Sequence, residues 1–390
     1  MDLTAIQKEL RAEKLDGWLF YDHHRRDPIA GRILGAGNGM NTRRWFYLIP
    51  ARGEPRKLVH RIESAALDHL PGKKLVYSSH EELTAGLARV LGAARTVAMQ
   101  YSPHNDIFYV SMVDAGTVEL VRSLKRRVVT SADLVQRFEA AWTPEQLESH
   151  RAAGRQVDAI TQAAFRRAAE FVREGRALSE YELIEWIRGE FRLNGLETED
   201  GPHVAIGPSS GDPHYEPSAA SSRPLRAGEL LMLDVWAKLA RPDSVYYDIT
   251  WMGFLGAAVP ERYAKIFSIV REARDAAIAF IQKNVRAGRP ICGFEVDRVA
   301  RGVIRKAGYA QNFIHRTGHS LGRDVHGAGA NMDDLEVHDV RRVMPHTCFS
   351  IEPGIYFPEF GVRTEVNVYV DEHEAGVTGA VQQEIIPLLA

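Results

Sequence analysis

Four acidic residues stand inside apolar stretches of the second part of the chain. They are Asp234 in LLMLDVW, Asp248 in YYDITWMG, Glu352 in CFSIEPGIY and Glu365 in VRTEVNVYV. Acids are seldom buried without a partner, and clustered bare carboxylates would repel one another and take up protons. Two divalent cations would offset four such charges. The set therefore predicts a metal site rather than four unrelated strand residues.

Histidines gather in the same part of the chain. HRTGHSLGRDVHG places His315, His319 and His326 in one glycine-rich loop, and His214 stands in PHY at 213–215. Carboxylates with one imidazole form a mostly oxygen site, which suits Mn²⁺, with Co²⁺, Fe²⁺ or Zn²⁺ as alternatives. Two ions about 3.5–4 Å apart can share a hydroxide that attacks a carbonyl. The predicted reaction class is metal-assisted hydrolysis.

The elements that must position these residues form an internal repeat. Pro144-Glu145 and Pro260-Glu261 open two long amphipathic helices 116 positions apart. Each is followed by a second helix, at 179–191 and 293–308, by a Gly/His loop, and by two strands that carry the acids. Asp234 corresponds to Glu352 and Asp248 to Glu365, at offsets of 118 and 117. We expect a duplicated domain with a pseudo-twofold axis, near which the acids meet.

The first part of the chain reads as a smaller α/β domain. We expect a domain at 1–142 and a second at 143–390, because Thr143 and Pro144 form a helix start. Between the first two strands, HHRRDPIAGRILGAGNGMNTRR (residues 23–44) reads as a long loop. The predicted strands are 17–22, 44–49, 57–62 and 96–101, and the predicted helices are 3–15, 62–70 and 80–91.

Composition excludes several functional classes. The 390 residues are 45% hydrophobic and 26% charged, with a net charge of -2. This balance argues against a nucleic-acid partner and against a polybasic membrane signal. No apolar run is long enough for a transmembrane helix, the N-terminus lacks a signal-peptide pattern, and Cys292 and Cys348 read as free thiols. We therefore expect a cytoplasmic protein.

On these motifs the chain resembles the pita-bread metallopeptidases, which comprise methionine aminopeptidase, aminopeptidase P and prolidase, with creatinase as a metal-free relative. The resemblance covers residues from about 145 to 390. The N-terminal part resembles the extra domain of aminopeptidase P, prolidase and creatinase. The implied fold class is α/β (α+β), with a creatinase/prolidase-like N-terminal domain and a C-terminal pita-bread domain.

The resemblance also implies residue roles. Asp234 would chelate one ion, Asp248 and Glu365 would bridge both, and His319 and Glu352 would hold the other. His214 and His326 match the histidines that bind the substrate carbonyl and the oxyanion, and His315 matches a third histidine in the pocket. Arg363 matches an arginine beside the last ligand. Glu352 is also the family's candidate for moving a proton.

Three positions depart from the family pattern. Asp234 and Asp248 are fourteen positions apart, three more than usual, with the extra residues in the turn of KLARPDSVYY. Trp251 replaces an arginine after the Asp-x-Thr run. Val366 replaces the acid that often follows the last glutamate. All five metal ligands remain.

The resemblance of the N-terminal part implies cleavage at Xaa-Pro bonds, most simply by an Xaa-Pro dipeptidase (prolidase). The resemblance also implies a homodimer. An Xaa-Pro aminopeptidase acting on longer peptides is the alternative, and a peptidase of broader specificity is also open. Two rivals are a creatinase-like metal-independent hydrolase and a non-catalytic pita-bread module that binds peptides or proteins. A dipeptidase needs a cation for the free carboxylate, and the candidates are Arg363 and, in a loop that could close the partner's cleft, Arg25, Arg26, Arg32, Arg43 and Arg44.

Overall fold

The computed structural model describes residues 1–35 and 41–390, which form two compact units. One unit comprises residues 1–139 and the other residues 140–390, where the sequence predicted 1–142 and 143–390. Within the described ranges, no helix combines the length and apolarity needed to cross a bilayer.

The N-terminal unit is built on one mixed sheet with the strand order β4-β3-β2-β1-β5-β6. On one face, residues such as Leu19, Phe46 and Leu48 pack with Leu87 of α3 and Val121 of α4. The elements are α1 (Leu3–Ala12), β1 (Gly17–Asp22), α2 (Pro28–Leu34), β2 (Trp45–Pro50), β3 (Arg56–His60), β4 (Lys73–Tyr77), α3 (His80–Leu91), β5 (Thr96–Met99), α4 (Ala115–Ser123), β6 (Arg127–Thr130) and α5 (Ala132–Val135).

Two expectations for this unit are wrong. The segment 23–44 is not a continuous loop, because α2 begins after Asp27, whose side chain caps Ala30 N–H, with Pro28 in the first turn and Ile29 and Ile33 buried. Residues 36–40 of that segment lie outside the described residues. The expected helix at 62–70 reduces to a single 3₁₀ turn at Arg61–Glu63, followed by further turns.

The C-terminal unit has the repeated organisation that the sequence predicts. The first half contains α6 (Pro144–Arg173), α7 (Glu180–Leu193), β7 (Leu196–Glu197), β8 (His203–Ile206), β9 (Leu230–Leu239) and β10 (Tyr247–Phe254). The second contains α8 (Glu261–Arg286), α9 (Gly293–Lys306), β11 (Ser320–Leu321), β12 (Cys348–Ile351), β13 (Gly354–Phe357), β14 (Phe360–Arg363), β15 (Val366–Val370), β16 (Ala375–Val377) and β17 (Ile386–Pro387).

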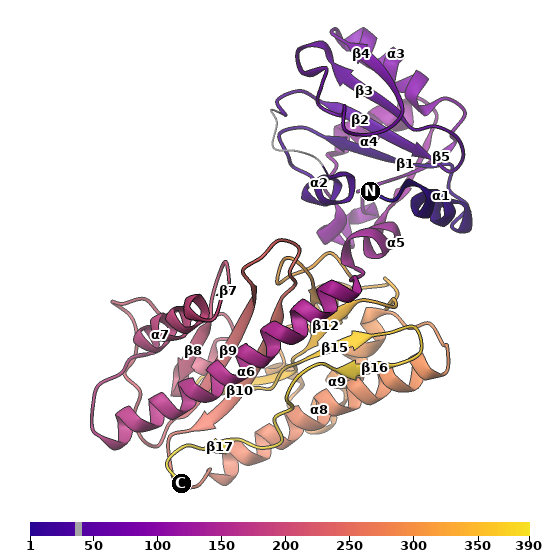
Figure 1. Ribbon diagram of the computed structural model, residues 1–390. Coiled ribbons are helices and arrows are strands. Elements are labelled where there is room, and N and C mark those ends of the chain that lie inside the picture. Colours follow the sequence, from indigo (N-terminus) through magenta and orange to yellow (C-terminus); the bar gives the residue numbers. More distant parts are fainter. Residues whose placement is uncertain (36–40) are drawn as a thin grey trace. The chain divides into compact units, whose positions relative to one another are not determined.

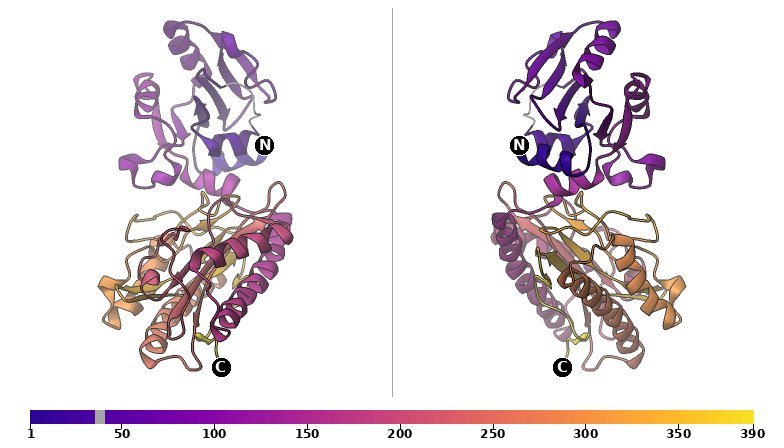
Figure 2. Two further views of the ribbon diagram at one scale, coloured as in Figure 1. Left: turned by 90° about the vertical axis from the view of Figure 1, so that its left-hand side faces the viewer. Right: turned by 90° about the vertical axis from the view of Figure 1, so that its right-hand side faces the viewer.

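Each pair of helices covers its own group of strands. The α6 and α7 helices pack against β8, β9 and β10, and α8 packs on α9 and on β12 and β16. The views in Figure 1 and Figure 2 show the strands between the two helix layers. Thr143 and Gln146 form a reciprocal capping box at the start of α6, and Ser179 and Glu182 form another at α7. The capping residue Thr143 is the one that the sequence predicts.

Strand alternation separates the core from the site. Leu231, Leu233 and Val235 of β9 belong to the core formed with α6 and α7. The intervening Met232 and Asp234 must then face the opposite side, toward the second half. On β10 the same alternation turns Ile249 to the helices and Asp248 away from them. The first half thus presents carboxylates on its inner face.

Besides the pairing of β10 with β17, the two halves meet where β10 lies beside β15 of a different sheet, and we call this second contact the central seam. Two amide side chains of the second half form hydrogen bonds with the backbone of β10. Asn367 accepts from Asp248 N (3.0 Å) and donates to Asp248 O (2.5 Å), and Gln382 accepts from Met252 N (2.9 Å) and donates to Met252 O (2.6 Å). Glu365 N donates to Thr250 O at 3.2 Å. The seam therefore fixes the backbone of β10 through side-chain amides of the second half.

One fully buried histidine of α6 lies outside the site. His150 Nδ1 is 2.7 Å from Tyr246 O, and Nε2 is 2.7 Å from Thr378 Oγ1. Since a carbonyl can only accept, Nδ1 carries the proton and the Thr378 hydroxyl donates to Nε2. Burial lowers the pKa of His150 to about 4. The neutral ring is thus the form that the fold accommodates.

We predict that His150 contributes to acid unfolding. Its folded pKa lies below the ordinary value of 6.5, so its contribution is complete above pH 6.5 and is lost as pH falls toward 4. The free energy of unfolding should drop by about 2 kcal/mol between pH 8 and pH 5 from this residue. Urea denaturation of wild type and His150→Gln at both pH values measures it: the variant should show the smaller drop. His373→Gln, at an exposed position, is the control. Equal drops in wild type and His150→Gln would contradict the prediction.

Candidate metal centre

The antiparallel register of β9 and β10 brings two of the predicted acids together. Asp234 lies opposite Thr250, and Asp248 lies two residues before Thr250, so the side chains of Asp234 and Asp248 share one face. They are 9% and 4% exposed. Three extra residues separate these acids relative to the family pattern, but they fall in the turn between the strands and leave this pairing intact.

The two glutamates of the second half lie just outside strands, which corrects the expectation that strands carry all four acids. Glu352 follows β12 and precedes Pro353, which has no N–H with which to continue a ladder. Glu365 lies between β14 and β15, and its N–H bonds across the seam to Thr250 O. The symmetry of the repeat therefore holds for the residues but not for their secondary structure.

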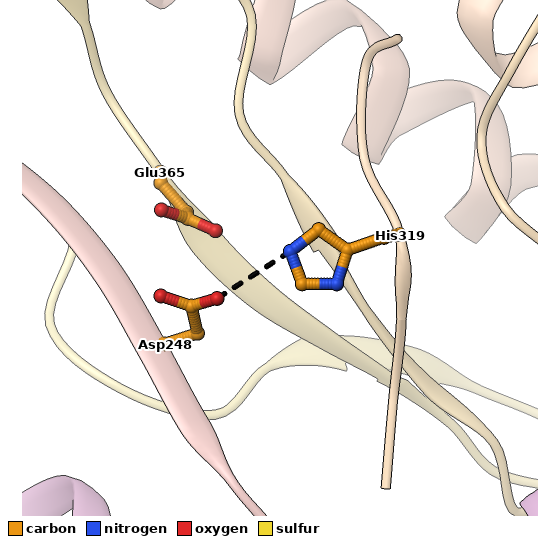
Figure 3. A group of neighbouring side chains, drawn as sticks. All are labelled: Asp248, His319 and Glu365. Carbon is orange, nitrogen blue, oxygen red and sulfur yellow. Dashed lines mark ion pairs between the residues drawn. The ribbon is translucent and has the colours of Figure 1, made fainter. Parts of the chain in front are cut away.

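His319, just before β11, completes the cluster. Its Nε2 is 3.4 Å from Asp248 Oδ2 and 3.4 Å from Glu352 Oε1. Asp248, His319 and Glu365 each offer one ligand atom, and these atoms lie within 4.8 Å of one another (Figure 3). Buried Asp248 Oδ1 and Glu365 Oε1 have no hydrogen-bond partner among the described residues. Such orphaned oxygens fit a site that binds cations.

The electrostatics of the cluster point the same way. Burial, followed by the charge of Asp234, raises the pKa of Asp248 well above its usual range. Burial, followed by Asp248, does the same to the pKa of Glu365, and burial raises the pKa of Glu352. Burial also lowers the pKa of His319. The protein alone thus disfavours four ionised carboxylates here, and divalent ions would remove the conflict.

Arg363 supplies the cluster with one internal positive charge. Its guanidinium forms an ion pair with Asp234, donates to Thr250 Oγ1 (2.9 Å) and approaches the Tyr356 hydroxyl (3.4 Å). The Thr250 hydroxyl donates to Glu365 Oε2 at 2.7 Å. Arg363 is 5% exposed and lines the cavity, but its donors are engaged with the site's own residues.

The histidines expected at the site have different surroundings. His315 Nδ1 lies 2.7 Å from Arg316 O and must donate to it, so the neutral ring accepts at Nε2 from the Tyr356 hydroxyl (2.8 Å). Burial and then Arg363 lower its pKa to about 3. His326 lies edge-on to His319, with ring centroids 4.4 Å apart, and His319 followed by burial lowers the His326 pKa to about 2. His214 is exposed and lines the cavity.

All nine predicted residues border one cavity of about 390 Å³. They are Asp234, Asp248, Glu352, Glu365, His319, His214, His315, His326 and Arg363. Our sequence reasoning missed a further histidine, His203, which also lines the cavity. Its position at the start of a short strand in GPHVAIG, ahead of the PHY motif, was the only signal, and finding it required the pairing of β8 with Asp234's strand.

A buried network holds the loop that carries His315 and His319. Asp297 of α9 accepts from Thr317 N (3.0 Å), from Thr317 Oγ1 (2.7 Å) and from Arg301 Nε (2.8 Å). Arg301 also donates to Phe313 O (3.0 Å) and His315 O (2.9 Å). Asp297 is fully buried. The ion pair between Asp297 and Arg301 of α9 therefore holds this loop in place.

The seam generates a test of how Asp248 is positioned. Asn367→Leu removes both bonds to the Asp248 backbone and should cost about 3 kcal/mol of unfolding free energy, since two buried groups lose their partners. Gln382→Leu removes the matching pair at Met252 and should cost a similar amount. Only Asn367→Leu should also weaken Mn²⁺ binding, by about tenfold or more, because Asp248 is its neighbour. Calorimetric titration measures this, and equal Mn²⁺ affinity in the two variants would contradict the assignment.

The chain is similar to known metallopeptidases and dipeptidases. Residues 152–372 match the model of metallopeptidase family M24. The chain is 28% identical over 350 residues to the probable dipeptidase PepE of Mycobacterium tuberculosis, covering 87% of the chain and 84% of that protein. It is 29% identical over 237 residues to the Xaa-Pro dipeptidase of Lactobacillus helveticus, covering 60% and 58%.

The fold of the chain also resembles the folds of solved dipeptidase structures. The dipeptidase PepE of Mycobacterium ulcerans superposes with a TM-score of 0.74 and 23% identity, covering 99% of this chain and 96% of that one. The expected pita-bread architecture is therefore confirmed. Because the family model spans more than half of the chain, the protein belongs to metallopeptidase family M24.

Proposed function

We propose that the protein hydrolyses Xaa-Pro dipeptides with two divalent metal ions held by Asp234, Asp248, His319, Glu352 and Glu365. Asp234 would serve one ion, His319 and Glu352 the other, and Asp248 and Glu365 both. The observation that carries the proposal is the convergence of these five groups in one cavity, with two buried carboxylate oxygens lacking partners among the described residues.

The ions, once bound, supply Lewis-acid polarisation and lower the pKa of water. The chain's own residues supply the rest. His326 and His214, both on the cavity, would donate to the carbonyl oxygen as it gains charge. Glu352, which accepts from Ser350 Oγ at 3.2 Å, would carry a proton to the leaving nitrogen. His315, bonded at both nitrogens, would orient Tyr356 and thereby Arg363.

The substrate class rests on three supports. The relative from Lactobacillus helveticus is an Xaa-Pro dipeptidase. A cavity of about 390 Å³ is of a size for a small peptide. The proline amide has no N–H, so a site for it must accept a ring without that donor. An Xaa-Pro aminopeptidase is the alternative within the same chemistry.

The cation for the substrate carboxylate remains part of the proposal. Arg363 is one candidate, although Asp234 already holds it. Of the arginines between residues 25 and 44, Arg32 forms an ion pair with Glu139 of its own unit. We propose that the other arginines of this group, Arg25, Arg26, Arg43 and Arg44, reach the cleft of the partner subunit and exclude longer peptides.

We further propose Mn²⁺ as the resident metal, a homodimeric assembly and a cytoplasmic location. A site of four carboxylates and one imidazole supports Mn²⁺, with Co²⁺, Zn²⁺ or Fe²⁺ as alternatives. Neither Cys292 nor buried Cys348 forms a disulfide among the described residues, which agrees with a reducing compartment.

The metal assignment predicts effects of opposite sign for one substitution. Without metal, Asp248→Asn should raise the thermal midpoint, because it removes one of the mutually repelling buried acids. With Mn²⁺, wild type should gain about 2–3 kcal/mol at a hundredfold excess over Kd, while the variant should gain little. Its peptidase activity should fall at least about a thousandfold. Scanning calorimetry with and without chelator measures the first two effects. A chelator that leaves wild type unchanged would refute the metal site.

The substrate assignment predicts the outcome of a peptide panel. With Mn²⁺, Ala-Pro and Leu-Pro should be cleaved at least about tenfold faster, in kcat/KM, than Ala-Pro-Ala and Leu-Pro-Leu, since a dipeptidase must exclude the longer chain. Ala-Ala tests for broader specificity. Release of free proline or of the first amino acid is followed by chromatography. Efficient turnover of the tripeptides with none of the dipeptides would replace the dipeptidase by an aminopeptidase.

A further inference from the structure

His203 occupies a place in the cavity that the proposed mechanism leaves unused. In the antiparallel pairing of β8 with β9, His203 lies opposite Asp234, so both side chains point to the same face. The side chain of His203 is 21% exposed. Its ring stands edge-on to Trp236, with centroids 4.8 Å apart and an interplanar angle of 88°. The ring is therefore fixed by the sheet and by an aromatic neighbour.

The two ring nitrogens face acidic groups without bonding to them. Nδ1 is 3.9 Å from Asp234 Oδ2, and Nε2 is 3.7 Å from Glu216 Oε1. Neither distance is a hydrogen bond, and neither nitrogen has another partner in the part of the chain that the structure describes. Glu216 lies on the cavity with a 78% exposed side chain, and Asp200 lines the same cavity. A polar ring and carboxylates thus border one end of the site.

We propose that His203 and Glu216 bind the α-ammonium group of the substrate, which rests on the peptidase function proposed above. An ammonium group has three donors and no acceptor. A neutral imidazole nitrogen of His203 and the carboxylate of Glu216 would each accept a hydrogen bond from the ammonium group. The edge-on contact with Trp236 would keep the imidazole ring in place. The contacts would select substrates with a free N-terminus.

The position of His203 determines whether it can contact the α-ammonium group of a substrate or the ε-ammonium group of a lysine side chain. In any peptide the α-nitrogen lies only about 2.5 Å from the carbonyl carbon of its own residue, because a single atom separates them. In an exopeptidase that releases one N-terminal residue, that carbonyl is the reacting one. The α-ammonium must then lie beside the ligand cluster, where His203 faces Asp234. The ε-ammonium of a lysine side chain lies several bonds farther away.

Matched substrates with and without the ammonium test the proposal. Ala-Pro and propionyl-Pro differ only in the α-amino group. His203→Phe keeps the aromatic contact with Trp236 but has no acceptor, and should lower kcat/KM for Ala-Pro about ten- to a hundredfold while leaving propionyl-Pro unchanged. His203→Gln, which retains an acceptor, should recover part of the loss. Glu216→Gln should lower kcat/KM for Ala-Pro severalfold, and Glu359→Gln, an exposed change outside the cavity, should have no effect.

Binding of L-alaninamide and propionamide, which also differ only in the α-amino group, separates this proposal from the peptidase function. Nuclear magnetic resonance titration of the Mn²⁺-loaded protein should show tighter binding of L-alaninamide, and His203→Phe should abolish the difference, even if no peptide is cleaved. Equal losses for Ala-Pro and propionyl-Pro would reduce His203 to a structural role and overturn the proposal. An effect of His203→Phe on Lys-Pro but not on Ala-Pro would overturn it as well, by assigning the site to a side chain.

Discussion

Mutual repulsion among buried carboxylates is the constraint on which the site depends. Asp234, Asp248, Glu352 and Glu365 converge on one cavity, and their carboxylates are largely shielded from solvent. The guanidinium of Arg363 opposes only one of four negative charges, so three remain if all are ionised. In a medium of low dielectric constant this arrangement is costly, and the raised pKa values of Asp248 and Glu365 express that cost. The folded chain tolerates the arrangement because other contacts hold it.

Those contacts come from the positions that alternate with the acids along the strands, and from neighbouring elements. Leucine and valine side chains of β9 anchor the strand to α6 and α7, and the alternate positions are then free to carry acids. Amide side chains from the other half, Asn367 and Gln382, bond to the backbone of β10 and keep the acids at a fixed distance. Helix α9 holds the histidine loop through Asp297 and Arg301. Separate groups therefore supply the packing and the candidate chemistry of the site.

The sequence predicts the repeat, the ligand set and most helices because these leave periodic or spaced signals. The offset between Asp234 and Glu352 and the cap at Thr143 are of this kind. It does not predict features that depend on pairing between distant segments. The partner of Arg363, the hydrogen-bond directions at His315 and the presence of His203 beside Asp234 all require the register of strands that are far apart in the chain. The α2 helix had a local signal in Asp27-Pro28, which the surrounding glycines and arginines obscured.

The central seam has a thermodynamic consequence. Each half supplies part of the candidate metal cluster, so an ion bound there would also cross-link the two halves. By reciprocity, whatever free energy the ions contribute to docking of the halves, the docked halves contribute to ion affinity. Loss of the Asn367 contacts, which involve the Asp248 backbone and not a proposed ligand atom, should therefore weaken ion binding, and removal of the metal should weaken the β10–β15 contact. In this duplicated fold, the interface between the repeats and the proposed metal site would then act as one cooperative unit.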